Sequence, residues 1–334
     1  MSTIAKVAER AGVSRTTVSH VVNHASRVSK PLRERVQAAI DELGYVPNRQ
    51  AQSLRTGRTN VVALLTADIH NPFYTEMVRT VQAELEKLQL DVMVFNTDVP
   101  GGHSQVHGRD YLREITTRRV DGLIVGDVAL HGINEELLRL DVPAVFLGHL
   151  NNHAVDSVRF DSFNGAFAMG QYLARKGHRR VANVTGPSFF EEANVRRDGF
   201  EAGLAAAGVE FDPALRFEGS YLEPSGRAAV EWLLEEHRGN MPSAIFFANY
   251  LMSMGGMPAL YDHGIRVPDD IAVAAFDDLP QFEYVRPRLT RVGNSPAALV
   301  ERAVPMLFER LSKQYLGPPR TETVPCHLLA FDSA

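Results

Sequence analysis

Residues 3–45 read TIAKVAERAGVSRTTVSHVVNHASRVSKPLRERVQAAIDELGY, and three apolar runs at helical spacing follow one another in them. The first run ends at Gly12, the second follows the N-cap residue Ser14, and the third lies between Ser29 and Gly44. Two short helices joined by a tight turn form a helix-turn-helix, whose second helix enters the DNA major groove. The stretch therefore predicts an N-terminal all-α head; the alternative is an ordinary small helical bundle. The residues expected in its core are Ile4, Val7, Ala8, Ala11, Val18, Val21, Val22, Val36, Ala39, Ile40 and Leu43.

Charge is distributed unevenly along the chain. Residues 1–59 hold ten Lys and Arg against four Asp and Glu, a net charge of +6, whereas the whole chain carries −5. The other 275 residues therefore carry −11. A basic head on an acidic body is typical of a nucleic-acid-binding protein, so the charge favours DNA binding over a purely structural bundle.

Length and composition further limit the class of protein to which the chain can belong. A chain of 334 residues predicts a small head with one or two larger domains, and the single cysteine, Cys326, excludes an intramolecular disulfide and fits a reducing cytosol. The chain has no run of about 18 apolar residues and begins without the apolar stretch of a signal peptide. It also lacks nucleotide-binding, serine-hydrolase and zinc-protease motifs. We therefore expect a cytoplasmic protein that is not an enzyme and holds no cofactor or metal.

From Asn60 onward, short apolar segments alternate with amphipathic ones. The expected strands are residues 61–66, 91–96, 122–125, 144–147, 181–185, 217–220, 244–248 and 271–275. Strands that alternate with helices predict parallel sheets covered on both faces. Two sets of four strands predict an α/β core of two doubly wound parallel-sheet lobes.

Ligands of such sheets bind beyond the carboxyl ends of the strands. Aromatic side chains beside Asn, Asp and Arg follow these ends, and they suit a small polar ring such as a sugar or a nucleobase. The residues in question are Asp68, Asn71, Phe73, Tyr74, residues 187–196, Tyr221, Asn249, Tyr250, Asp277 and Asp278.

The head closely resembles that of the lactose-repressor/galactose-repressor family of bacterial transcription regulators. The resemblance continues through NPFY at 71–74, VDGLIV at 120–125, GHRRVANVTGP at 177–187 and RVPDDIAVAAFDD at 266–278. It implies a head over residues 1–46, a hinge helix over 47–58 and a core of the periplasmic-binding-protein type I fold over 59–334. The implied N-lobe spans about 59–160 plus 290–319, and the C-lobe about 161–289 plus 320–334, with crossings near Phe160, Thr290 and Pro319.

In the head, the resemblance implies base reading by Arg15, Thr16 and His20, whose side chains suit base edges in the major groove. His20 stands where the family often has arginine, so the base that it reads is expected to differ; the alternative is an exposed surface histidine. The residues expected to bind phosphate oxygens are Ser14, Thr17, Ser19 and Asn23.

In the hinge, the family pattern places Ala51, Leu54 and Arg55 at the minor groove. Leu54 matches the leucine that wedges between base pairs at the centre of the operator and kinks the duplex. The alternative for Leu54 is packing against the core.

The resemblance also implies a set of effector-binding residues: Phe73, Tyr74, His149, Arg196, Tyr221, Asn249 and Asp277. Alternatives are an interlobe salt bridge for Arg196 and core packing for Phe73 or Tyr74. Gly148 and Tyr250 each replace an acid that is common in the family. Their loss disfavours a plain hexose, and residues 188–192 hold no basic group for a purine corepressor. A bulkier, partly apolar or cationic effector stays open.

The function implied is a homodimeric repressor that binds a pseudo-palindromic operator under the control of a small effector, such as a sugar or sugar-like metabolite. Residues 331–334 carry no leucine heptad of the tetramer-forming branch of the family, which favours a dimer. Alternatives are a regulator that acts partly as an activator or without an effector, and, remotely, a solute-binding protein.

Overall fold

The computed structural model describes residues 3–23, 28–45, 57–97, 120–126, 139–150 and 154–334, together with Leu112, Ile115, Thr117 and Leu137. The chain divides into two compact units, a head of Met1–Thr59 and a core of Asn60–Ala334. In the described part of the chain, no helix is long and apolar enough to cross a membrane. The predicted hinge residues Ala51, Leu54 and Arg55 lie outside the described residues.

The first two helices of the head form as predicted. α1 (Ile4–Ala11) ends at Gly12, which adopts the left-handed conformation with φ of 61°. α2 (Arg15–Asn23) begins after Ser14, whose Oγ accepts a hydrogen bond from the backbone N–H of Thr17 at 3.1 Å. A left-handed glycine followed by a serine cap turns the chain sharply between two short helices.

The third helix, α3 (Lys30–Leu43), closes the small core of the head and ends at the left-handed Gly44. Ser29 precedes it but makes no side-chain capping hydrogen bond, contrary to expectation. Pro31 explains part of this, because it removes one of the backbone N–H groups that a cap binds. The fully buried head residues are Val7, Ala8, Ala11, Val18, Val21, Val36 and Ala39, and Ile4, Val22, Ile40 and Leu43 pack against them.

The first sheet of the core has the strand order β11-β5-β4-β3-β1-β2 in the described residues, and every neighbouring pair is parallel. On β1, Val62 and Leu64 belong to one hydrophobic cluster, and Ala63 and Leu65 belong to another. The sheet is therefore buried on both faces, as a parallel sheet requires. Its strands are β1 (Val61–Thr66), β2 (Asp91–Asn96), β3 (Gly122–Val125), β4 (Ala144–Leu147), β5 (Asp156–Phe160) and β11 (Thr321–Val324).

The second sheet repeats this topology with the order β12-β10-β9-β8-β6-β7. All its described pairs are parallel except β10 with β12. Its strands are β6 (Val181–Thr185), β7 (Arg216–Glu218), β8 (Ala244–Phe247), β9 (Ala272–Phe276), β10 (Thr290–Gly293) and β12 (His327–Leu329). The repeated order confirms two doubly wound lobes.

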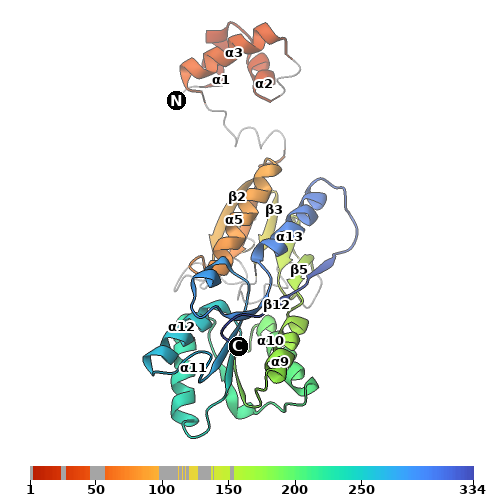
Figure 1. Cartoon of the computed structure of the whole chain (residues 1–334). Helices are drawn as coiled ribbons and strands as arrows, with labels where there is room; N and C mark the ends of the chain where they lie inside the picture. The colour runs from red at the N-terminus through yellow and green to blue at the C-terminus, as the bar shows by residue number, and fades with distance from the viewer. Residues whose placement is uncertain are drawn as a thin grey trace. The chain divides into compact units, whose positions relative to one another are not determined.

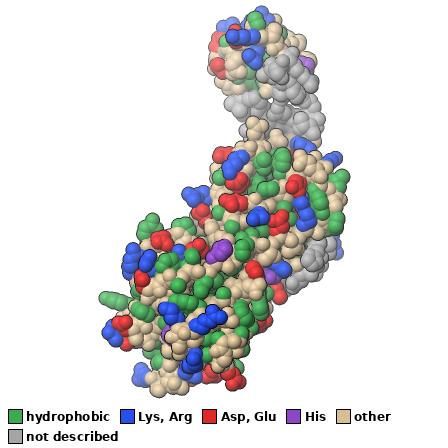
Figure 2. Space-filling view, turned by 45° about the vertical axis from the view of Figure 1, so that its right-hand side comes forward, with side chains coloured by type: hydrophobic (Ala, Val, Ile, Leu, Met, Phe, Trp, Pro, Cys, Tyr) green, Lys and Arg blue, Asp and Glu red, His purple; other side chains and the backbone are tan. Residues whose placement is uncertain are grey.

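Helices cover the sheets, as Figure 1 shows. On the first sheet, α5 and α13 pack together against one face. On the second, α9 and α10 lie on one face, and α11 and α12 lie on the other. Their bounds are α5 (Pro72–Lys87), α9 (Ser162–Arg175), α10 (Glu191–Ala206), α11 (Glu223–Glu236), α12 (Tyr250–Asp262) and α13 (Pro296–Leu311). On the face of the molecule in Figure 2, hydrophobic side chains are interspersed with charged ones.

Glycines allow α9 and α10 to approach closely. A Cβ on Gly199 would lie 2.3 Å from the carbonyl oxygen of Phe163, and one on Gly203 would lie 2.1 Å from that of Phe167. Both distances are shorter than van der Waals contact allows, so only glycine fits at these positions. The contact fixes α10 against its neighbour, which matters because α10 carries the charged residues described below.

The chain crosses between the lobes slightly later than predicted at two of three points. β10, starting at Thr290, pairs with β9 of the second sheet, and β11, starting at Thr321, pairs with β5 of the first. The crossings expected near Thr290 and Pro319 are therefore corrected to the segments after β10 and after β11. These strands are short and are interrupted by polar residues, so no apolar run marks them in the sequence.

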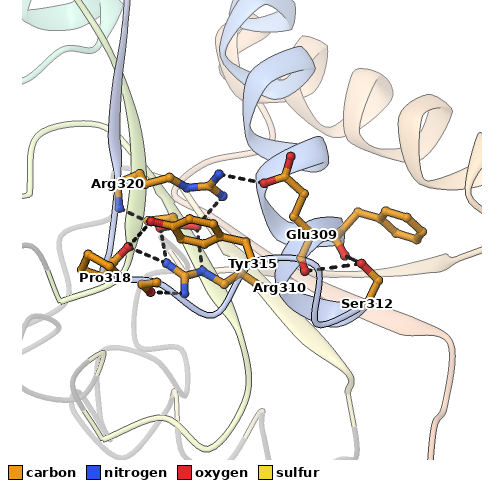
Figure 3. A network of polar contacts seen from close by, with 9 residues as sticks. Glu309, Arg310, Ser312, Tyr315, Pro318 and Arg320 are labelled. Carbon is orange, nitrogen blue, oxygen red and sulfur yellow. Dashed lines mark hydrogen bonds and ion pairs between the residues drawn. The ribbon is translucent and has the colours of Figure 1, made fainter.

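A buried carboxylate joins β5 to the segment between α13 and β11. The Asp156 side chain is fully buried and accepts hydrogen bonds from the guanidinium groups of Arg310 and Arg320 and from the backbone N–H of Arg320. Both guanidinium groups lie over the ring of Tyr315, and Arg320 also contacts Glu309 (Figure 3). Burial raises the pKa of Asp156, but these hydrogen bonds outweigh it and lower the pKa below the ordinary value of 3.8.

Asp156→Asn is expected to lower the free energy of unfolding of the core by about 2 kcal/mol, less than for a fully buried ion pair, because both arginines keep some exposure. Since the folded pKa is lowered, the stabilisation is present above the ordinary Asp pKa and lost as the pH falls below it. Urea denaturation between pH 7 and pH 3 measures both effects. Asp262→Asn, which breaks an exposed pair with Arg227, is the control. Equal acid sensitivity of wild type and Asp156→Asn would contradict this role.

Candidate functional site

The helix α2 exposes the residues predicted to read bases. Arg15, Thr16 and His20 are exposed, whereas Val18 and Val21 on the same helix are buried in the head. Exposed side chains of these types, opposite the buried face of a short helix, can reach the edges of bases. Their base-reading role stays a prediction.

The predicted phosphate-binding residues are spread from the start of α2 to its last residue, Asn23. The hydroxyls of Ser14 and Thr17 lie 2.9 Å apart and bond each other, and Ser14 Oγ also caps the helix. Ser19 is half-buried, and the side chain of Asn23 lies outside the described residues. The structure thus gives Ser14 a local capping role that does not require DNA.

A cavity of about 170 Å³ lies between the two lobes of the core. The N-lobe contributes residues that follow β1 and β4, and the C-lobe contributes residues that follow β6, β7, β8 and β9. Six of the seven residues predicted from family position line it: Phe73, Tyr74, Arg196, Tyr221, Asn249 and Asp277. The other lining residues are Ala67, Asp68, Asn71, Leu147, Gly148, Phe160, Phe190, Glu192, Ser220, Leu222 and Leu299.

Three charged side chains occupy the C-lobe side of this cleft. Arg196 Nε donates a hydrogen bond to Glu192 Oε1 at 3.1 Å, one turn away on α10. Arg196 Nη1 donates to the carbonyl of Ala248 at 2.7 Å and lies 3.7 Å from Asp277 Oδ1. The guanidinium carbon also lies 3.9 Å from the centre of the Phe276 ring. The alternative of an interlobe salt bridge for Arg196 is wrong, because both of its carboxylate partners belong to the C-lobe.

The pKa values of the two carboxylates shift in opposite directions, although burial raises both. Burial raises the pKa of Glu192, but Arg196 and the hydrogen bonds from His149 and Ser162 outweigh it and lower the pKa to about 2. Burial also raises the pKa of Asp277, and there Arg196 and the backbone N–H of Tyr250 compensate only in part. Glu192 is therefore the better stabilised anion of the two.

His149 lies beside the cleft rather than in its wall. It follows β4 of the N-lobe, and its Nδ1 lies 2.5 Å from Glu192 Oε2 on α10 of the C-lobe. Ser162 Oγ, at the start of α9, donates to Glu192 Oε1. His149, predicted to bind an effector directly, is thus placed to act through Glu192.

Aromatic rings form the remaining walls. Phe73 lies edge-on to Tyr74, with centroids 5.3 Å apart, and near Phe160 at 6.3 Å. On the opposite lobe, Phe190 and Tyr221 have centroids 6.0 Å apart. Phe73 packs against clusters of both lobes, so core packing and cleft lining are not alternatives for this residue.

Two asparagines of the cleft also cap helices. Asn71 Oδ1 accepts from the backbone N–H of Phe73 at the start of α5, and Asn249 Oδ1 accepts from that of Met252 at the start of α12. Asn249 Nδ2 donates to the carbonyl of Tyr221 at 2.8 Å. These bonds hold both side chains at the edge of the cavity and use part of their bonding capacity.

Glu192 is a charged residue of the cleft that family position does not single out. It lies within residues 187–196, which follow β6. The usable signal was its spacing of four residues from Arg196 within one helix, which places both side chains on the same face. Among the described residues, no group of His, Cys, Asp and Glu is arranged to hold a metal ion.

Comparison with protein families matches both units of the chain. The model of bacterial regulatory proteins of the lacI family matches residues 3–48, and that of a periplasmic binding protein-like domain matches residues 171–333. Together they describe a helix-turn-helix head attached to a two-lobed ligand-binding core, the architecture of a DNA-binding transcription regulator.

Individual relatives cover nearly the whole chain. The ribose operon repressor of Escherichia coli K12 is 32% identical over 328 residues, which are 97% of this chain and 98% of the repressor. A structure of the lac repressor dimer bound to operator and the anti-inducer ONPF has a TM-score of 0.87 at 28% identity and covers 99% of this chain and 98% of its own. A complex of the transcriptional regulator CelR with cellobiose has a TM-score of 0.74 at 30% identity, with full coverage of both chains.

The chain belongs to the lacI family of bacterial regulatory proteins. It is a DNA-binding transcriptional regulator, and the relatives with which it shares nearly its whole length are transcriptional repressors rather than enzymes.

The pair of Glu192 and Arg196 is expected to show strong energetic coupling. Either Glu192→Gln or Arg196→Met alone leaves a buried charge without its partner, whereas the double variant removes both charges. A double-mutant cycle on the free energy of unfolding should give a coupling of about 1–3 kcal/mol. The exposed pair of Arg227 and Asp262 serves as the control, for which no measurable coupling is expected. Additive effects at Glu192 and Arg196 would show that they do not act as a pair.

Proposed function

We propose that this chain acts as a homodimer that represses transcription from a pseudo-palindromic operator and responds to a sugar or sugar-like molecule bound between the core lobes. The observation that carries the proposal is the cleft itself. Phe73 and Tyr74 of the N-lobe face a cavity shared with Arg196, Tyr221 and Asp277 of the C-lobe. A ligand held by both lobes stabilises one interlobe arrangement over others, which is the thermodynamic requirement for control.

The relatives support a sugar-like effector and a dimer. One is named as the ribose operon repressor, one structure contains cellobiose, and the lac repressor is described as a dimer on its operator. A two-fold symmetric protein places one head on each half of a two-fold symmetric site. The proposal includes no catalysis and places the protein in the bacterial cytoplasm, where the operator lies.

In the proposed mechanism, α2 enters the major groove. Arg15, Thr16 and His20 read bases, while Ser14, Thr17, Ser19 and Asn23 position the helix on phosphates. The hinge residues Ala51, Leu54 and Arg55 contact the minor groove at the operator centre, with Leu54 as the wedge. The effector changes operator affinity only through its different affinities for two lobe arrangements, which typically supplies about 1–3 kcal/mol.

The effector site is tested by thermal stability against a panel of sugars, polyols and nucleosides. A ligand at 100 times its dissociation constant should stabilise the protein by about 2.7 kcal/mol. Asp277→Asn should weaken such binding about tenfold or more, because it removes a charged acceptor from the cleft. Asp198→Asn, on the exposed side of α10, is the control. Equal stabilisation of wild type and Asp277→Asn would place the ligand elsewhere, and an effector that leaves operator affinity unchanged would contradict the regulatory role.

The role of His20 is tested by selection of operators from random DNA with the full-length protein. His20→Arg is expected to change the preferred base at one position in each half-site, because arginine bonds guanine in a bidentate manner that histidine cannot reproduce. Gln37→Ala, at an exposed position on α3, should leave the selected site unchanged. An identical profile for wild type and His20→Arg would exclude base contact by His20.

A further inference from the structure

The charges of the cleft are unbalanced. Among the described residues that line it, Arg196 is the one cation, whereas Asp68, Glu192 and Asp277 are carboxylates. Asp68 has an exposed histidine, His70, 3.0 Å from its Oδ1, outside the set of lining residues. The lining residues alone therefore carry more negative than positive charge.

Glu192 pairs with Arg196, the one cation among the described lining residues. Its Oε1 accepts from Arg196 Nε and lies 3.1 Å from Arg196 Nη2, and the remaining nitrogen, Nη1, bonds the carbonyl of Ala248. About nine tenths of both side chains are buried, and Glu192 is ionised at any physiological pH because its pKa is about 2. The positive charge of this guanidinium is offset by the adjacent carboxylate, so it offers little net attraction to an anionic ligand.

The hydrogen-bonding groups of the cleft that remain available to a ligand are mainly acceptors. Asp277 Oδ2 accepts from the backbone N–H of Tyr250, but Oδ1 lies 3.7 Å from Arg196 Nη1, beyond hydrogen-bond distance. Asp68 Oδ1 accepts from the backbone N–H of His70. Both carboxylates can therefore accept hydrogen bonds from hydroxyl or N–H groups of a ligand. The rings of Phe73 and Tyr221, on opposite lobes, provide apolar walls.

We infer that Glu192 determines the charge of the effector: by neutralising Arg196 it restricts the cleft to uncharged or cationic, donor-rich rings and excludes phosphorylated or carboxylated ones. This inference rests on the proposed effector function of the cleft and narrows it. An anionic ligand would meet Asp277 and Glu192 with no unpaired cation among the described lining residues, and close like charges in a partly buried site repel strongly. A hydroxyl or ammonium group would instead donate to Asp277.

The first test needs no effector. Glu192→Ala vacates the position between His149, Ser162 and Arg196 that a carboxylate now occupies. Added acetate is expected to fill it and raise the melting temperature of Glu192→Ala well above the effect of sodium chloride at equal ionic strength. Wild type and Glu191→Ala, which loses an exposed acid at the adjacent position of α10, should respond to acetate and chloride alike. No specific acetate response in Glu192→Ala would overturn the inference.

The second test uses glucosamine, glucose and glucuronate, which share a six-carbon pyranose ring and differ in charge, together with ribose and ribose 5-phosphate. Titration calorimetry compares wild type with the isosteric Glu192→Gln, which keeps the shape of the site if Glu192→Ala does not fold. Glucuronate and ribose 5-phosphate should bind wild type at least tenfold more weakly than their uncharged counterparts, and Glu192→Gln should reduce or reverse that ratio. Glu191→Gln should leave it unchanged.

An anion that binds wild type as tightly as its uncharged counterpart would overturn the inference, as would an unchanged ratio in Glu192→Gln. If no sugar of either charge binds any variant, the proposed sugar-like effector is contradicted, and the acetate response of Glu192→Ala still decides the inference. The two failures are therefore distinguishable.

Discussion

Burial of a parallel sheet on both of its faces is the constraint on which the core depends. Because the internal strands are buried on both faces, the carboxyl ends of the strands are where polar side chains can reach a ligand. The two sheets repeat one strand order, and segments following strands of both sheets line a single cavity. The position of the cleft thus follows from topology, and its chemistry follows from the few residues placed there.

Within that cleft, burial and charge pairing determine which side chains can bind a ligand. Arg196 contacts Glu192, Ala248 and Phe276, so most of its bonding capacity is used inside the protein. Asp277 is held at the start of α12 by the N–H of Tyr250 and keeps an oxygen outside hydrogen-bond distance of Arg196. In the sequence Arg196 and Asp277 look equally suited to bind a ligand. In the structure most donors of Arg196 bond protein groups, whereas Asp277 keeps an oxygen that can accept from a ligand.

His149 connects this charge set to the opposite lobe. It follows β4 of the N-lobe and contacts Glu192 on α10, which glycine-mediated packing fixes against α9. A contact of this kind makes the polar network of the cleft depend on the arrangement of the lobes.

Local patterns in the sequence were sufficient for the head and for most strands of the core. The helices of the head follow from apolar spacing, the cap at Ser14 and glycines at positions 12 and 44, all of which act within a few residues. Six residues named from family position line one cavity, and their role in effector binding stays a prediction: Phe73, Tyr74, Arg196, Tyr221, Asn249 and Asp277. The crossings that follow β10 and β11 were placed slightly too early, because the lobe to which each short strand belongs is set by its pairing with β9 or β5 and not by a local pattern. Only the tertiary structure decided that Glu192 and Arg196 are buried together and that His149 of the N-lobe contacts Glu192, since burial and contacts between distant segments are not contained in a one-dimensional pattern.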